Sequence, residues 1–128
     1  KYMPNEPTEE YLVTAVAEPF RRALQRKGAM QHSSSSECVD AEFLLACNGA
    51  IHTMQSDFSC IRSARGFASA GIGADYALGA LQALPNLTGR ERVLAALQCA
   101  ADLSPQVQPP FHVLQFPIPS TPSPRRKS

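Results

Sequence analysis

The first pattern along the chain is an apolar residue at every fourth position near its start. These positions are Leu12, Val16, Phe20 and Leu24. The spacing places them on one stripe of a helix, which Thr8 can cap and Gly28 can end. Because Pro19 lacks an amide hydrogen and clashes with the preceding turn, we expect a kink or two abutting helices near Glu18.

The next apolar runs predict a β-hairpin. The serine-rich residues 30–40 come first and predict a flexible surface loop. Asn48-Gly49 then separates two apolar runs, 43–47 and 50–54, and tolerates the two positive φ angles of a tight hairpin turn. A two-residue turn places Cys47 opposite Ala50, which sets the register of the whole pair. Both faces of 43–47 are apolar, so we expect an interior strand that is covered on both sides.

Residues 58–84 predict a short strand at 58–62, a further strand end at 66–70, a glycine-rich turn and a helix. Gly71 and Gly73 lack a Cβ, so the backbone there can take a positive φ or pass close to another segment. Asp75 offers a side-chain oxygen to cap the helix. The helix has almost no polar face, so we expect it to lie between layers. Its apolar stripe is Tyr76, Ala77, Ala80, Leu81 and Leu84.

A second helix follows a turn at residues 85–87. Thr88 and Glu91 have the T-x-x-E spacing of a capping box, and Pro105 ends the helix at about Ser104. Its expected apolar side is Val93, Leu94, Leu97, Ala100 and Ala101. Residues 111–116 predict a last strand, and the proline, serine and arginine residues of 117–128 predict a disordered tail. We therefore expect one domain over residues 1–116, followed by that tail.

Composition narrows the class of protein. The chain has 128 residues, of which 44% are hydrophobic and 18% charged, and its net charge is +1. These values are typical of one globular domain and give no reason to expect nucleic acid or a membrane as a partner. The four cysteines are dispersed, with no C-x-x-C, which favours buried thiols in a reducing compartment. No run approaches the length of a membrane span, so we expect a cytoplasmic protein.

Other candidate chemistry lacks the spacing that it needs. His32, His52 and His112 have no ligand spacing, so we expect neither a metal nor a cofactor. The turn 71–73 could hold an anion at a helix N-terminus, but a nucleotide fingerprint needs a third glycine and a βαβ unit. The order of helix, hairpin, strand, glycine turn, two helices and strand favours an α+β fold over a doubly wound sheet.

Residues 43–81 and 88–104 together resemble the second half of a proteasome-type β-subunit, such as that of bacterial HslV. In that family an N-G hairpin precedes a turn of pattern G-x-G-x-x-Y-A. The matching residues here are Gly71, Gly73, Tyr76 and Ala77. Thr88, Glu91 and Asp102 lie where the family has its capped second helix. The resemblance covers residues 43–104 well, the first helix loosely and the tail not at all.

The resemblance implies a four-layer αββα sandwich of the N-terminal-nucleophile (Ntn) hydrolases, in which two antiparallel sheets lie between two pairs of helices. It also implies a ring of identical or sister β-type subunits that cleaves peptides through an N-terminal threonine, whose own amine takes the proton. This chain begins with Lys1. We therefore expect the nucleophile, and roughly the first third of the domain, to lie upstream of that residue.

Two residues bear on activity under this resemblance. The family's peptidases usually have a serine between the two glycines, and Ile72, which stands there, can neither donate nor accept a hydrogen bond. Asp102 matches a carboxylate that helps to organise the family's site; otherwise it is a polar helix-end residue bonded to a nearby loop.

Three hypotheses follow, and they leave open whether the protein is an enzyme. The first is a subunit of a self-compartmentalising threonine peptidase whose nucleophile-bearing part is absent from this chain. The second is an inactive Ntn-fold protein with a structural or assembly role. The third is an unrelated small α+β binding module, which a structure without two stacked sheets would favour.

Overall fold

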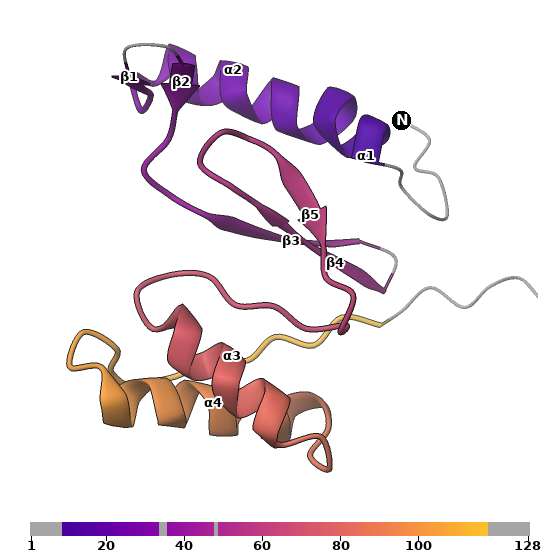
Figure 1. The fold of residues 1–128 in the computed structure, drawn as a ribbon, viewed down its shortest axis with the longest axis vertical. Coiled ribbons are helices and arrows are strands. Elements are labelled where there is room, and N and C mark those ends of the chain that lie inside the picture. The colour runs from indigo at the N-terminus through magenta and orange to yellow at the C-terminus, as the bar shows by residue number, and fades with distance from the viewer. Residues whose placement is uncertain (1–8, 34–35, 48, 118–128) are drawn as a thin grey trace, which may run out of the picture.

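The computed structural model describes residues 9–33, 36–47 and 49–117. Its helices are α1 (Glu9–Leu12), the π-helical η1 (Val13–Ala17), α2 (Glu18–Arg26), α3 (Ala74–Ala83) and α4 (Gly89–Leu103). Its strands are β1 (Gln31–Ser33), β2 (Ser36–Cys38), β3 (Phe43–Cys47), β4 (Ala50–Met54) and β5 (Cys60–Arg62). Figure 1 shows α1 and α2 on one side of the sheet β3-β4-β5, with α3 and α4 on the other. The α+β class is therefore confirmed.

The N-terminal helix changes its winding next to Pro19. In η1 the amide of Glu18 donates to the carbonyl of Val13, five residues earlier, which is the π-helical pattern. Pro19 lies in the first turn of α2, where a missing amide hydrogen costs least. The winding therefore changes near Glu18, but the backbone of Ala17 and Glu18 stays helical, so the predicted break between two abutting helices is not seen. Thr8, the predicted cap, lies outside the described residues.

Gly28 ends this helix as the sequence predicts. Its φ is 69°, in the left-handed region that glycine adopts without a steric penalty. The amide of Gly28 donates to the carbonyl of Gln25 at 3.0 Å, and the amide of Ala29 donates to that of Leu24 at 3.0 Å. These two bonds satisfy carbonyls that the helix end would otherwise leave without a donor.

Residues 31–33 and 36–38 form two short paired strands where the sequence predicts a flexible loop. β1 pairs antiparallel with β2, with His32 opposite Glu37. The polar composition of these strands gives no sign of the pairing, because the residue that anchors them, Val39, comes after β2. Val39 is buried, and its amide donates to the carbonyl of Ser56 at 3.0 Å. That bond ties the residue after β2 to the turn after β4, so the loop prediction is wrong for the two strands.

The hairpin of β3 and β4 has the predicted register, with Cys47 opposite Ala50 and the remaining pairs of residues 43–54 in step. Gly49 has a φ of 79°, as its place in the turn requires. Asn48 lies outside the described residues.

β5 adds to the other side of β4, with Cys60 opposite Met54. It begins two residues later than predicted because Phe58 takes a positive φ of 67° in the connecting turn. Asp57 accepts hydrogen bonds from the amide and the hydroxyl of Ser59, at 2.9 and 2.6 Å, and so holds that turn. Residues 66–70 pair with no described strand.

The helix and the sheet enclose the larger core. Leu12 packs there with Met54 and Phe58, all three nearly inaccessible to solvent. The rings of Phe20 and Phe43 meet edge to face, with centroids 5.0 Å apart. One face of the sheet is thereby covered by the N-terminal helix.

The prediction that β3 is an interior strand is wrong for the described residues. The sheet order is β3-β4-β5, which leaves β3 at the edge. Leu44 points away from the N-terminal helix and is 45% exposed, and Ala46 is exposed as well. Residues 43–47 are apolar on both faces, but only one face has a packed layer against it in this structure.

α3 and α4 pack against each other in a second, smaller core. Its buried residues are Ala77, Leu81, Ala96 and Ala100. α3 is not enclosed between layers as predicted, since Tyr76 is 44% exposed and Leu78 is 39% exposed. Small side chains allow the two helix backbones to approach closely, so alanines carry this contact.

The two helix caps differ in detail from the prediction. The N-cap of α3 is Gly73, and Asp75 lies in the first turn without a capping hydrogen bond, so its predicted role is wrong. Thr88 is the N-cap of α4, as predicted, but its side chain makes no capping bond. α4 ends at Leu103 with Ser104 as its C-cap, which confirms the predicted end.

The last segment runs back along α4 and forms no strand with any described residue. From Gln108 to Pro117 no backbone group bonds to the backbone of another described residue. Leu114 and Phe116 are 77% and 80% exposed. The predicted strand at 111–116 is therefore absent here, because a strand requires a neighbour. Residues 118–128, most of the predicted tail, lie outside the described residues.

Candidate functional site

The glycine turn before α3 uses its two glycines for two different purposes. Gly71 takes a φ of 103°, which a side chain would strain. Gly73 provides space: a Cβ built on it would lie 2.7 Å from Cγ2 of Val107 and 3.2 Å from Cβ of Ala100. The sequence predicts both properties for the turn, and the structure assigns one to each residue. Ile72, between them, is 66% exposed.

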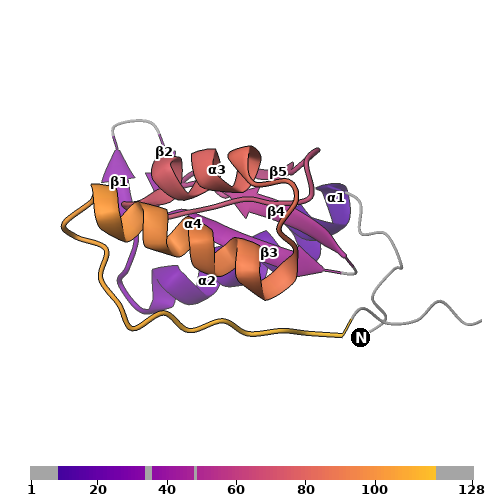
Figure 2. The ribbon, with the colours of Figure 1, turned by 90° about the horizontal axis from the view of Figure 1, so that it is seen from below.

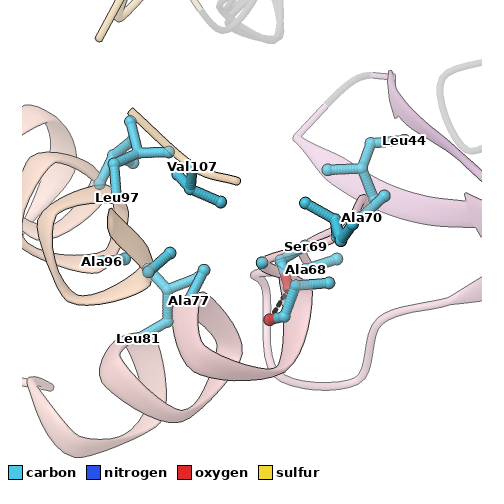
Figure 3. Close-up of a pocket in the computed structure, with 14 residues that line it drawn as sticks. Leu44, Ala68, Ser69, Ala70, Ala77, Leu81, Ala96, Leu97 and Val107 are labelled. Carbon is cyan, nitrogen blue, oxygen red and sulfur yellow. Dashed lines mark hydrogen bonds between the residues drawn. The ribbon is translucent and has the colours of Figure 1, made fainter. Parts of the chain in front are cut away.

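A cleft of about 350 Å³ opens beside this turn, between the sheet and the paired helices. Figure 3 shows its lining, with Leu44 of the sheet on one side and residues of α3 and α4 facing it across the gap. The lining residues are Leu44, Ala68, Ser69, Ala70, Ile72, Gly73, Ala74, Ala77, Leu81, Val93, Ala96, Leu97, Ala100 and Val107. Val93 and Leu97, expected on the apolar side of α4, thus face the cleft.

The lining is almost entirely apolar. Ser69 is its one polar side chain among the described residues, and its hydroxyl donates to the carbonyl of Ala74 at 2.6 Å. That bond holds the segment before α3 in place. The Ser69 hydroxyl therefore has no basic side chain beside it in the lining that could activate it as a nucleophile. The lining can therefore bury apolar polypeptide surface, but it offers no nucleophile.

The segment after α4 forms a further wall beside the cleft. Val107 donates its amide to the carbonyl of Ser104 and contacts the glycine turn. The amide nitrogen of the Gln115 side chain lies 3.9 Å from the position of a Cβ on Gly89, at the opposite end of α4. Figure 2 shows this yellow segment following α4 along its length. Its backbone remains without strand partners in the described part of the chain.

Asp102 does not join this site. Its side chain is exposed, and its Oδ1 accepts a hydrogen bond from Nε2 of Gln98, one turn earlier on α4, at 2.7 Å. It is not among the residues that line the cleft. In this chain the structure thus brings Ile72 and Gly73 to the cleft, while Asp102 remains on the outer surface of α4.

Arg92 joins α4 to α3 and to the loop before the glycine turn, a role that the sequence reasoning missed. Its guanidinium donates through Nε to the carbonyl of Leu81 at 3.0 Å, and through Nη2 to the same oxygen. Its Cζ lies 4.8 Å from the centre of the Phe67 ring. The available signal was its spacing of four and eight residues from Ala96 and Ala100, which places an arginine on a buried stripe.

The two carboxylates of the described residues whose pKa is shifted lie away from the cleft. The hydrogen bonds from Ser59 lower the pKa of Asp57, in the β4–β5 turn. The bond from Arg21 lowers the pKa of Glu18, on α2.

In the part of the chain that the structure describes, no three His, Cys, Asp or Glu residues gather as a metal site would require. No helix there has the length and apolar character needed to cross a bilayer.

His52 is the one buried polar side chain whose nitrogen is without a partner among the described residues. It is 2% exposed, and its Nδ1 makes no hydrogen bond there. It lies on β4 between Leu45 and Arg62 of the neighbouring strands, on the face toward the N-terminal helix. It therefore lies across the sheet from the cleft and belongs to the core.

Comparison with known proteins places the fold and leaves the family open. No protein-family model matches the chain, and no curated protein sequence matches it either. The chain is similar to a solved structure described as Thiobacillus denitrificans BPH, with a TM-score of 0.65 and 18% identity. The match covers 94% of this chain and 63% of that chain. At this identity the likeness concerns the fold alone, and this chain spans less than two thirds of the other.

Proposed function

We propose that this chain is the C-terminal two thirds of a β-type subunit of a proteasome-like, self-compartmentalising peptidase of the N-terminal threonine type. The observation that carries the proposal is the apolar cleft between one sheet face and the α3–α4 pair. In a four-layer αββα sandwich, a second sheet occupies that position. The proposed activity is taken from the resemblance to such subunits, which lies in the hairpin, the glycine turn and the capped helix.

The open face of the sheet has the properties that a buried layer requires. Leu44 and Ile61, 45% and 53% exposed, are apolar side chains of β3 and β5. Residues 111–116 follow α4 without a backbone hydrogen bond to the backbone of any other described residue, and provide one extended segment for a second sheet. Under this proposal, further strands belong to the part of the domain expected upstream of Lys1.

The proposal includes the partners and the location of the activity. Sister or identical subunits form a ring, peptides are the substrates, and no cofactor takes part because the threonine and its amine perform the chemistry. The location is the cytoplasm. All four cysteines lie in described residues and are thiols, two of them buried, which supports a reducing compartment.

The shape and activity of the intact protein test this proposal. Electron microscopy and light scattering should show a multi-subunit ring, and N-terminal sequencing should find a processed threonine. A fluorogenic peptide should be hydrolysed, and hydrolysis should stop when that threonine is replaced by alanine. A monomeric intact protein would overturn the proposal.

A substitution in the cleft tests the second sheet separately. Leu44→Asp should destabilise the intact protein by about 3 kcal/mol or more, since it would bury a charge, and the 128-residue chain much less. Val13→Asp is the control, because Val13 is similarly exposed, at 40%, on the opposite helix layer. It should have equal effects in both proteins. If Leu44→Asp also acts equally in both, no second sheet covers this face.

A second candidate is an inactive Ntn-fold protein with a structural or assembly role. Ile72, at the centre of the turn, and the surface position of Asp102 favour it, since neither residue can assist proton transfer at the cleft as they stand. An intact ring that has no processed threonine and hydrolyses no peptide would favour this second candidate over the peptidase.

A further inference from the structure

We draw no further inference here: the strongest candidate, the unpaired segment 108–117 with exposed Leu114 and Phe116 beside the cleft, belongs to the site already described, and nothing else in the structure shows what covers it.

Discussion

The guanidinium of Arg92 lies over the ring of Phe67, with 4.8 Å between Cζ and the ring centroid, while its nitrogens donate to the carbonyl of Leu81. One side chain of α4 therefore joins the last turn of α3 to the segment that leads into the glycine turn. Arg65 adds a second link from this loop to α3, by donating to Oε1 of Gln82 at 3.0 Å. These contacts connect the α3–α4 pair to the loop that precedes the glycine turn.

We predict that Arg92→Lys lowers the free energy of unfolding by about 1 kcal/mol and Arg92→Ala by about 2 kcal/mol. Lysine keeps the charge but loses the planar stacking surface and the two-nitrogen approach to one carbonyl. Urea unfolding followed by circular dichroism measures both. The control is Arg90→Ala, an exposed position on the same helix, which should change stability by less than about 0.5 kcal/mol. Equal losses for Arg92→Ala and Arg90→Ala would contradict the role of these contacts.

The two glycines at positions 73 and 79 should respond oppositely to alanine. Gly73→Ala places a Cβ 2.7 Å from Val107 and should cost about 1–3 kcal/mol. Gly79→Ala meets nothing within 4 Å in mid-helix and should stabilise by about 0.5–1 kcal/mol. Thermal unfolding compares them under identical conditions.

A double variant identifies the cause at Gly73. Val107→Ala removes the methyl group that the new Cβ would meet, so Gly73→Ala should be less costly in the Val107→Ala background than in the wild type. If the cost of Gly73→Ala is the same in both backgrounds, the close approach to Val107 is not its cause.

His52 should be far less important for stability than its burial implies. Since its Nδ1 has no hydrogen-bond partner among the described residues, His52→Leu loses no bond there and should change the free energy of unfolding by less than about 1 kcal/mol. Met54→Ala, two positions along the same strand face and 2% exposed in the wild type, should cost about 2–5 kcal/mol. Chemical denaturation of both variants measures these two changes in the free energy of unfolding. A loss at His52 as large as that at Met54 would contradict this prediction.

Asp57 should make stability depend on pH in the acid range. Hydrogen bonds from the hydroxyl and amide of Ser59 lower its folded-state pKa, so its charged form stabilises the folded protein above the unfolded-state pKa of about 3.9. This contribution is lost as the pH falls through the folded-state pKa. Wild type should therefore exceed Asp57→Asn in stability at pH 7, and the difference should shrink toward about pH 2.

Urea unfolding at several pH values measures this difference. A pH-independent difference between wild type and Asp57→Asn would show that the carboxylate charge does not act through this turn.

Several features of the fold follow from the sequence because they depend on local chemistry. Asn48-Gly49 set the register of residues 43–54, which the structure confirms. Gly28 ended the first helix, and Pro19 marked a change of winding. Turn geometry, helix ends and proline sterics each depend on a few neighbouring residues, so a single sequence predicts them well.

Predictions that depended on distant partners were less successful. An apolar run cannot show which of its faces is covered, so residues 43–47 were wrongly expected to be interior. Residues 111–116 have strand composition but no described neighbour. The role expected for Asp102 stays a prediction; in this structure its side chain bonds to Gln98 on the surface.

The sequence by itself determined that the segment around Gly71 and Gly73 is a glycine turn that opens a helix. The tertiary structure decided which glycine bends the backbone and which leaves room for Val107. It also brought Arg92 of α4 to the carbonyl of Leu81 on α3, and formed an apolar cleft beside the turn. The physical reason is that φ preference belongs to a residue and its neighbours, whereas close approach and burial belong to segments that meet only when the chain has folded.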